Sequence, residues 1–423
     1  MFRSAQLMTR RAAAMLMLAG AGLLIAGTTL LPSEMSGGGG GGSRWGLFSG
    51  DRDVADAIRN VILFAPLGLG LALLGVPLAR AAAFGFVASG IIETLQLSII
   101  PGRDASLEDL LTNSVGTALG ASLAAIAPHI YGPPSVRKER AGLVALVAAW
   151  LLVVGSSALT LPALPESRYF GQWNHEFGGR KWEGARVLAA SVGSLEIVDW
   201  ELENSREVRQ ALLAGAPIEV LGVAGDRVER ATSFLQIADH RQREIFFIGP
   251  DRDDLVFRYR MRATALGFDQ PDLRLRGALA ATRAGDTIVI RAWREDGTYC
   301  LRLNEQRACG LGSSAAGGWQ LLMHPDHVPP AGLSLAGAAW LALLAAPFAS
   351  LTSSRRGLLG GALILALAPA VSALLPGVLL PGVVEWLGLP LGVWAGHAAG
   401  ARLSAMPARD GGGVHARSDS RSY

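Results

Sequence analysis

Polar side chains recur at helical spacing inside apolar segments of the first third of this chain. The segment "SGIIETLQ" carries Glu93 and Gln96, and the segment "LEDLLTNSVG" carries Asp109 and Asn113. Residues three, four or seven positions apart share one face of a helix. Inside a membrane, a carboxylate on such a face must be paired, hydrated or protonated, so it marks a candidate site. The candidate membrane-pocket residues are Asp56, Asn60, Glu93, Gln96, Arg103, Asp109 and Asn113.

The composition is that of an integral membrane protein. Of the 423 residues, 50% are hydrophobic and only 17% are charged, and the mean hydropathy is +0.34. A soluble domain is typically about 25% charged. The formal net charge is only +3, and most Lys and Arg residues flank apolar runs, which argues against nucleic-acid binding. The two cysteines form no CxxC pair and no cluster with histidine, so we expect no zinc and no cofactor.

Eight segments are long and apolar enough to be membrane helices, which need about 20 residues. They are 12–32, 56–78, 81–100, 107–130, 141–161, 331–351, 357–375 and 378–400. The Lys and Arg residues of the short loops favour a cytoplasmic N-terminus, and eight spans return the C-terminus to the same side. The first segment follows Arg10 and Arg11 as a signal peptide would. No clear A-x-A cleavage site follows it, so an uncleaved helix is favoured.

This topology gathers the polar residues near the extracytoplasmic surface. Asp56 and Asn60 stand at the outer end of a helix that runs inward. Glu93 lies in the outer half of the next helix, and Asp109 and Asn113 begin the helix after that. We therefore expect one polar pocket, in which Glu93 faces either the loop cation Arg103 or Asn113.

Simpler explanations stay open for single residues of this set. Ser106 precedes Asp109 by three positions, which is the spacing of a capping box, so Asp109 could merely start its helix. Gln96 and Asn113 could be hydrogen bonds that join helices. The set as a whole is a stronger indication of function than any one member.

Residues 163–328 have a different pattern, in which apolar runs are short and alternate with polar residues. Examples are "SLEIVDWEL", "REIFFIG", "DLVFRYRMRA" and "DTIVIRAW", with turn residues between them. Many short strands at intervals of about 8–12 residues predict an all-β sandwich. Because this region follows the fifth span, we expect it on the extracytoplasmic side.

The two cysteines bear on that placement. If Asn304 and Glu305 form the two-residue loop of a hairpin, Cys300 falls opposite Cys309 in a non-hydrogen-bonded pair. The Cα atoms of such a pair are close enough for a disulfide, which persists in an oxidising compartment. We therefore expect a Cys300–Cys309 disulfide, with two unrelated buried thiols as the alternative.

Three ordered motifs stand on successive apolar segments: "DAIRNVILFAPLG" (56–68), "SGIIETLQ" (89–96) and "GRDASLEDLLTNSVGTALG" (102–120). Together they resemble the VanZ family of small membrane proteins. The resemblance covers about residues 12–130 and implies a four-helix membrane domain. Some members are linked to glycopeptide resistance, but the family has no settled mechanism, so the resemblance implies no catalytic residue. The positions that match its motifs are Asn60, Glu93, Gln96, Arg103, Asp109 and Asn113.

The β-rich region resembles, more loosely, the concanavalin A-like lectin/glucanase and laminin-G jelly rolls. The similar stretches are "FGGRKWEG", "DDLVFRYRMRA" and "DGTYCLRLNE". Some glycosidases of that fold place paired carboxylates on one face of a strand, and the nearest string here is Glu196-x-x-Asp199-x-Glu201. Glu196 and Asp199 fall on opposite faces of a strand, so hydrolysis is disfavoured. An acidic turn is a better interpretation of "GPDRDD" than a calcium site. Core packing is likewise favoured over sugar stacking for Trp173, Trp182 and Trp293.

The whole sequence predicts an α-helical transmembrane bundle of about eight spans and an extracytoplasmic all-β jelly-roll sandwich. The expected units are a VanZ-like domain (1–131), a loop with the fifth span (132–162), the sandwich (163–328), three further spans (329–401) and a disordered cytoplasmic tail (402–423). We expect a multi-pass protein of the cell inner (cytoplasmic) membrane with both termini in the cytoplasm.

Binding is the favoured function, and catalysis is left open. The sandwich would engage an envelope glycan or a partner protein, and the polar pocket would engage a lipid head group or a lipid-linked precursor. One alternative is a membrane enzyme that modifies an envelope lipid or glycan through Glu93, Asp109 and Arg103. Another is a structural assembly protein whose polar face only joins helices. Membrane lipids are expected partners, and nucleic acid is not.

Overall fold

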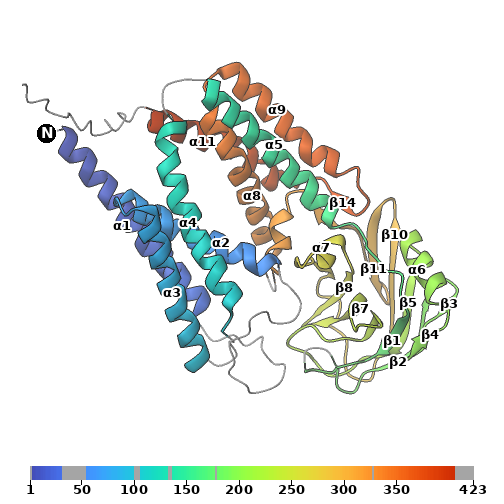
Figure 1. The fold of residues 1–423 in the computed structure, drawn as a ribbon. Coiled ribbons are helices and arrows are strands. Elements are labelled where there is room, and N and C mark those ends of the chain that lie inside the picture. Colours follow the sequence, from blue (N-terminus) through green and yellow to red (C-terminus); the bar gives the residue numbers. More distant parts are fainter. Residues whose placement is uncertain are drawn as a thin grey trace, which may run out of the picture.

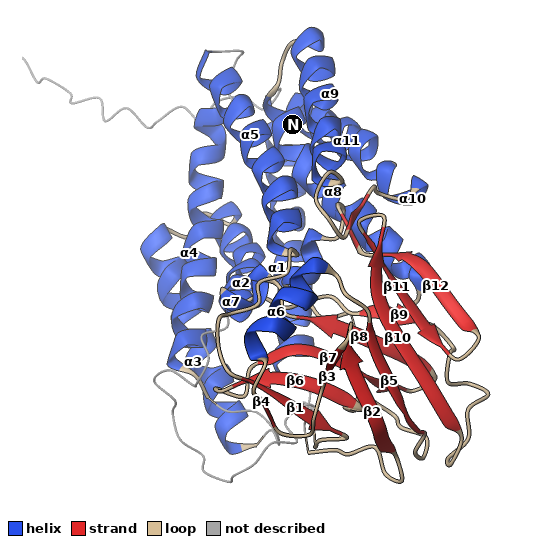
Figure 2. Cartoon of the chain, turned by 90° about the vertical axis from the view of Figure 1, so that its right-hand side faces the viewer, coloured by secondary structure: helices blue, strands red, loops and turns tan. Residues whose placement is uncertain are grey.

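The chain folds into two groups of long helices and one β-sandwich (Figure 1). The computed structural model describes residues 2–30, 54–99, 105–131, 136–176, 179–325 and 328–404. The sandwich is inserted between the fifth and sixth long helices of the chain. In Figure 2 its strands fill the lower part of the molecule and the helices rise beside and above them.

The first helix group is packed closely through glycines. Its members are α1 (Phe2–Thr29), α2 (Val54–Leu73), α3 (Leu78–Ser98) and α4 (Leu107–Ile130). A Cβ atom added at Gly120 would lie 1.9 Å from the carbonyl oxygen of Ala65, and Gly116 meets the backbone of Val61 in the same way. The spacing of Gly116 and Gly120 predicts such a contact, and this prediction is confirmed.

Helix α1 is an integral part of this bundle. Its Ala21 and Ile25 are buried together with Phe64 and Leu67 of α2. These contacts are those of a helix that belongs to a four-helix bundle. That α1 is not cleaved off as a signal peptide stays a prediction.

The second helix group also uses glycines for close contact. It contains α5 (Val136–Leu159), α8 (Pro330–Leu351), α9 (Arg355–Ser372) and α11 (Gly388–Ser404). Four glycines recur along α11 at four-residue intervals. A Cβ at the first, Gly388, would lie 2.1 Å from the Ala338 carbonyl oxygen of α8, and one at the last, Gly400, would lie 2.1 Å from that of Ser350. The two helices therefore run in contact over the whole length of α11.

Seven helices of the described chain are long and apolar enough to cross a membrane. They correspond to the first seven predicted segments. The eighth predicted span, 378–400, is not one continuous helix, because strand β14 (Val378–Leu379) and helix α10 (Val383–Trp386) precede the 17-residue α11. Pro381 and Gly382 interrupt the apolar run, since proline lacks an amide hydrogen and glycine favours irregular backbone. The prediction of eight full-length spans is therefore not confirmed.

The predicted β-sandwich, which follows α5 and precedes α8 in the chain, is present as two six-stranded antiparallel sheets. The first sheet has the order β4 (Glu201–Leu202), β1 (Tyr169–Trp173), β6 (Leu235–Asp239), β7 (Glu244–Asp251), β8 (Asp254–Tyr259) and β9 (Leu273–Leu275). The second has the order β12 (Gln306–Leu311), β11 (Thr298–Leu303), β10 (Thr287–Glu295), β5 (Ile218–Val223), β2 (Arg186–Val192) and β3 (Leu195–Glu196). Shorter elements are α6 (Ser205–Ala214), α7 (Arg262–Ala265), η1 (Gly318–Leu321) and β13 (Ser313–Ser314).

Alternating burial explains how these strands form a core. Along β5, Ile218 and Val220 are buried between the sheets, while Glu219 and Leu221 are exposed on the outer face. This period of two is the one that the sequence displays. Strand β7 differs, because it is buried along nearly its whole length and so is covered on both faces.

The hairpin of β11 and β12 has the predicted register and disulfide. Leu303 pairs with Gln306, which makes Asn304 and Glu305 the two-residue loop. Cys300 and Cys309 are bonded, with 4.0 Å between their Cα atoms. The expectation of a Cys300–Cys309 disulfide is confirmed.

The sandwich is fastened to both helix groups. The Ala55 N–H at the start of α2 donates to the Gly267 carbonyl at 2.9 Å. Strands β13 and β14 pair in parallel, which ties the end of the sandwich to the segment before α10. The bundle end that carries the start of α2 is called the sandwich end below.

Candidate functional site

Helices α2 and α4 are joined by polar side chains at the sandwich end. The Asn60 amide donates to the Asp109 carboxylate at 2.9 Å and lies 3.4 Å from the Thr112 hydroxyl. All three side chains are partly buried. The structure thus brings together Asn60 and Asp109, two candidate residues from different segments.

Glu93 of α3 binds the start of α4. Its side chain is 1% exposed, and its Oε2 accepts the Ser106 N–H at 2.8 Å. Ser106 is the N-cap of α4, and its hydroxyl accepts the Asp109 N–H at 3.4 Å. In a capping box the third helical residue would take the N-cap N–H. Here Glu93 takes it, so capping does not account for the Asp109 carboxylate, which binds Asn60.

Asn113 lies one helical turn further along α4, about 6 Å from the level of Asp109. It is 2% exposed, and its amide donates to the Ser89 hydroxyl of α3 at 2.9 Å. The other amide atom, Oδ1, is buried without a hydrogen-bond partner. Burying an acceptor without a partner lowers stability by about 1–3 kcal/mol, and a donor that reached this atom would recover that free energy.

Asn60, Glu93, Ser106, Asp109 and Asn113 are together called the polar layer below. Thr117, on the next turn of α4, lies beneath this layer. Thr117 is fully buried, and its hydroxyl donates to the Asn113 carbonyl. A Cβ at Gly85 of α3 would lie 2.4 Å from the Thr117 hydroxyl oxygen, and one at Gly68 of α2 would lie 1.8 Å from the Thr117 carbonyl oxygen. The polar side chains therefore lie at the sandwich end of the bundle, and the helices pack tightly below them at Gly68, Gly85 and Thr117.

The remaining candidate residues have other positions. Gln96 is 5% exposed and donates to the Thr29 carbonyl at 3.0 Å, which fastens the end of α1 to α3. Asp56 pairs with Arg59, and 57% of its side-chain surface is exposed. Arg103 lies outside the described residues. The expected facing of Glu93 toward Arg103 or Asn113 stays a prediction.

Arg59 is a contact residue that the sequence reasoning did not single out. Its Nη1 donates to the Asp269 carboxylate at 3.0 Å and to the Leu322 carbonyl at 2.7 Å, both in the sandwich region. Burial raises the pKa of Asp269, and the charge of Arg59 opposes that rise. An arginine within the apolar string "DAIRNVILF" was the available signal. Because Asn60 follows directly, the polar layer and the sandwich contact lie at the same end of α2.

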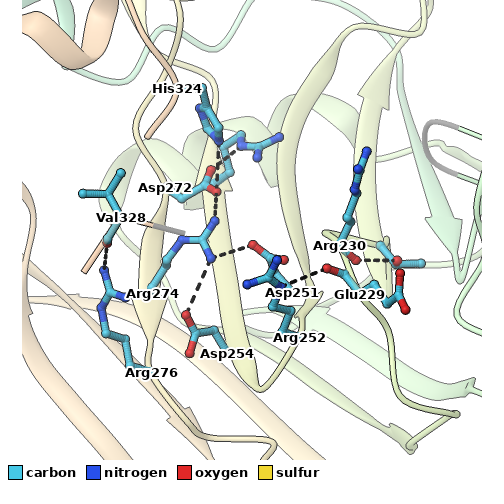
Figure 3. A network of polar contacts seen from close by, with 12 residues as sticks. Glu229, Arg230, Asp251, Arg252, Asp254, Asp272, Arg274, Arg276, His324 and Val328 are labelled. Carbon is cyan, nitrogen blue, oxygen red and sulfur yellow. Dashed lines mark hydrogen bonds and ion pairs between the residues drawn. The ribbon is translucent and has the colours of Figure 1, made fainter. Parts of the chain in front are cut away.

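A second polar network joins β8, β9 and neighbouring segments of the sandwich, and most of its charged side chains are buried (Figure 3). The Asp272 carboxylate lies 2.6 Å from Arg258, 3.0 Å from Arg274 and 3.4 Å from His324. Burial alone would raise the pKa of Asp272, but Arg258 and His324 hold it well below its usual range. His324 belongs to the segment that leads into α8, so this network ties that segment to the sandwich.

Arg274 also bears on whether the "GPDRDD" turn could bind calcium. Its guanidinium lies 2.6 Å from the Asp251 carboxylate and 3.6 Å from that of Asp254 (Figure 3). A cation of the chain already stands between these two acids. The geometry favours an acidic turn over a calcium site.

The carboxylates considered for glycoside hydrolysis do not form a pair. Glu196 is in β3 of the second sheet, whereas Glu201 is in β4 of the first. Asp199, between them, accepts the Trp173 N–H at 2.7 Å. These carboxylates therefore lie on different elements and do not share one strand face.

Two of the three tryptophans, Trp182 and Trp293, have structural surroundings. Trp182 is 3% exposed and packs edge-on against Phe234 with 5.1 Å between ring centroids. Trp293 has the guanidinium groups of Arg291 and Arg307 at 5.2 Å and 4.9 Å from its ring centroid. Cation–π contacts of this kind occupy a face that a sugar would need.

One group of potential metal ligands occurs in the described ranges, formed by Glu295, Cys300 and Cys309. Thiolate is the metal-binding form of cysteine. Because these two sulfurs are joined as a disulfide, they supply no thiolate. The group therefore does not make a metal centre in the oxidised protein.

Comparison with known proteins identifies the first helix group. Residues 20–128 match the family model described as VanZ/LLP1. No curated protein and no solved structure matches the chain. The contacts of Asn60, Glu93, Asp109 and Asn113 all lie within the matched range. The N-terminal helical region of this chain is therefore VanZ-like, and the β-sheet-rich region that follows it is consistent with a jelly-roll insertion.

Proposed function

We propose that the VanZ-like bundle binds the polar head group of an envelope lipid or of a lipid-linked precursor. The protein is a multi-pass component of the cell inner membrane, with the sandwich on the extracytoplasmic side and both termini in the cytoplasm. Helix α11 supports the cytoplasmic C-terminus, because it runs parallel to α8 and returns the chain to the side on which α8 ends. In this arrangement the sandwich meets an envelope glycan or a partner protein next to the head-group site.

The observation that carries this proposal is the unpartnered Oδ1 of Asn113. Polar groups within a membrane are costly, and those that persist commonly mark a ligand path or a site. Here Asn60, Asp109 and Glu93 are bonded within the bundle, while a buried acceptor just beneath them lacks a donor. A head group that enters from the membrane surface would supply it.

The position of the sandwich supports the same function. Arg59 donates to Asp269 and to the Leu322 carbonyl of the sandwich region. The next residue in the chain, Asn60, donates to Asp109 in the polar layer. A ligand held by the polar layer therefore lies close to the sandwich, which can restrict the head groups that reach it. This proximity also gives the sandwich a reason to be inserted in a VanZ-like chain.

A structural function is the second candidate, and one observation favours it. Glu93 accepts the Ser106 N–H, which is a helix-capping interaction that needs no ligand. In that case, substitutions in the polar layer would change stability alone. An enzyme that uses the Glu93 and Asp109 carboxylates on an envelope lipid or glycan is a third, for which the geometry gives no separate support.

Lipid-dependent melting of the full-length protein in mild detergent tests the proposal. We expect a polar lipid extract of bacterial membranes to raise the melting temperature of the wild type more than that of the Asn113→Leu variant. The matched control is Tyr131→Phe, which removes a 2.7 Å hydrogen bond to Ser350 at the opposite end of α4. The control should keep the wild-type response to lipid. An equal response in all three proteins would favour the structural function.

A further inference from the structure

The outer face of the second sheet carries a row of three arginines, one on each of the strands β10, β11 and β12. Resting on the proposed contact of the sandwich with the cell envelope, we infer that this arginine row binds an anionic envelope glycan through its carboxylate or phosphate groups. The inference comes from the register of the three strands, from the pairing of the charges and from the shape of the surface.

The register of the strands sets the arginines directly opposite one another. Arg291 of β10 pairs with Arg302 of β11, and Arg302 pairs with Arg307 of β12. On β11 the neighbours Leu301 and Leu303 lie in the core, so Arg302 points to the outer face. Neighbouring strands are about 4.8 Å apart, and the row therefore extends about 10 Å across the sheet.

The central arginine of the row has no acid to neutralise it. Arg291 lies 3.3 Å from Glu219, and Arg307 lies 2.7 Å from Glu295. No acidic side chain of the described residues pairs with Arg302, and its Nε is buried without a hydrogen-bond partner. Like charges that face each other on neighbouring strands destabilise a sheet. Local features that oppose stability are typical of functional sites, and here the charge calls for an anionic ligand.

The outer arginines of the row are held in place but remain accessible. The guanidinium groups of Arg291 and Arg307 lie 5.2 Å and 4.9 Å from the centroid of the Trp293 ring. The Nε of Arg307 also lies 3.2 Å from the Sγ of Cys309, so the disulfide helps to position it. The Arg291 side chain is 36% exposed and that of Arg307 is 52% exposed. A guanidinium can donate two parallel hydrogen bonds to a carboxylate or a phosphate.

The surface around the row suits a chain better than a small molecule. Val289 of β10 and Leu221 of β5 lie next to the row on the same face and are 37% and 39% exposed, so the described helices leave this face accessible. Sites for small molecules are concave, whereas these charges lie in a line on a sheet. An extended acidic peptide would instead pair with the edge strand β12. That edge is bulged, and Gly310 has a φ of +71°, which disfavours the addition of a strand.

Binding of charged polymers to the full-length protein in non-ionic detergent tests the inference. Carboxymethyl dextran and dextran phosphate carry the two candidate anions on one kind of glycan chain, and unmodified dextran carries none. Polyglutamate carries carboxylates on a peptide. We would measure the Kd of each polymer by microscale thermophoresis at low and at physiological salt. We expect the wild type to bind at least one charged dextran but not dextran itself, and to bind more weakly at the higher salt concentration.

Variants of the central arginine separate binding from stability. Arg302→Gln should weaken the binding of the charged dextrans roughly tenfold, which corresponds to about 1.4 kcal/mol, and Arg302→Glu should abolish it. Both variants should melt at or above the wild-type temperature, because they remove repulsion between neighbouring strands. The matched control is Arg168→Gln, which removes the same charge next to the first sheet, where the Arg168 side chain is 76% exposed. This control should bind like the wild type.

The remaining outcomes each bear on one claim. The charged dextran that binds more tightly identifies the anion as carboxylate or phosphate. No binding to either charged dextran, or equal binding by the wild type and the Arg302 variants, would overturn the inference. Polyglutamate bound more tightly than both, in a manner that depends on Arg302, would overturn the glycan in favour of an acidic protein. Arg302→Gln should keep the wild-type melting response to lipid. A wild type that binds a charged dextran but shows no lipid response would contradict the head-group site alone.

Discussion

Glu93 has two possible tasks that its substitutions can separate. Its carboxylate caps α4 through the Ser106 N–H, and it lies in the layer proposed to bind a head group. Glu93→Gln keeps an oxygen that can accept the N–H, whereas Glu93→Ala leaves a buried donor unsatisfied. We expect the Gln variant to melt close to the wild type and the Ala variant to lose about 1–3 kcal/mol of stability.

The same pair of variants reports on function. If Glu93 contacts the head group, Glu93→Gln should lose most of the lipid-induced rise in melting temperature although it folds normally. A wild-type lipid response in both variants, together with unchanged stability, would remove Glu93 from the site.

Tyr169 predicts how the sandwich responds to alkaline pH. The ring is fully buried in the core, and its hydroxyl donates to the Pro165 carbonyl at 2.7 Å. Burial raises the pKa of Tyr169 to about 12. A group whose pKa is raised by folding contributes stability below its unfolded pKa of about 10 and loses it as the pH passes through the folded value.

We therefore expect the stability of the sandwich to fall between about pH 10 and pH 12. Burial also raises the pKa of Tyr259 and Tyr299, so part of the fall belongs to them. Chemical denaturation at pH 8 and pH 11 would compare the wild type with Tyr169→Phe. The Phe variant should lose less stability over this interval, and an equal loss would show that Tyr169 does not titrate there.

At the scale of elements, the contact of α2 with α4 depends on glycine. A Cβ at Gly120 would lie 1.9 Å from the Ala65 carbonyl oxygen, so even alanine forces the helices apart. We expect Gly120→Ala to lower the melting temperature strongly, although alanine favours helix by about 1 kcal/mol over glycine. Gly90 of α3 is the matched control, because its nearest neighbour is a Leu110 methyl at 3.9 Å. Gly90→Ala should be neutral or stabilising, and similar behaviour of the two variants would refute the close contact.

The hairpin disulfide offers a second test at this scale. Cys300 is fully buried, so the bond lies against the sandwich core. Closing a loop of about ten residues is expected to contribute roughly 2–3 kcal/mol. The double variant Cys300→Ala/Cys309→Ala should lose about that much in chemical denaturation. Peptide mapping without reductant should find one linked peptide pair in the wild type, and two free thiols would reject the bond.

Elements with a strong local pattern could be predicted from the sequence. Continuous apolar segments indicated the helices, and alternation indicated the strands, because burial follows the geometry of each element. The two-residue loop at Asn304 and Glu305 fixed the register of its hairpin, and hence the pairing of Cys300 with Cys309. The last span was mistaken because length and apolarity outweighed Pro381 and Gly382, which end regular structure.

Contacts between distant segments were harder to predict. The sequence places Asn60 and Asp109 on polar faces but does not state that they touch, since this depends on how Gly116 and Gly120 seat α4 on α2. Arg59 was overlooked because its partner, Asp269, comes 210 residues later. Gln96 has the spacing of a site residue, yet its hydrogen bond to Thr29 fastens α1, which only the packed helices reveal.

At the scale of the whole molecule, the polar layer and the sandwich form one unit at one end of the bundle. Arg59 and Asn60 are consecutive, and they connect α2 to the sandwich and to α4 respectively. If the sandwich is extracytoplasmic, the polar layer opens toward the outer surface, where envelope lipids and precursors present their head groups. The proposed function therefore depends on the side of the membrane on which the sandwich lies.

Thiol labelling in intact spheroplasts tests that dependence most directly. Both native cysteines are bonded, so an introduced cysteine is the thiol to be labelled, with the wild type as the blank. Trp200 of the sandwich is 75% exposed, and Arg355 is exposed at the start of α9, at the opposite end of the helices. A membrane-impermeant maleimide should label Trp200→Cys at once and Arg355→Cys only after permeabilisation. Labelling of Arg355→Cys but not of Trp200→Cys in intact spheroplasts would contradict the account.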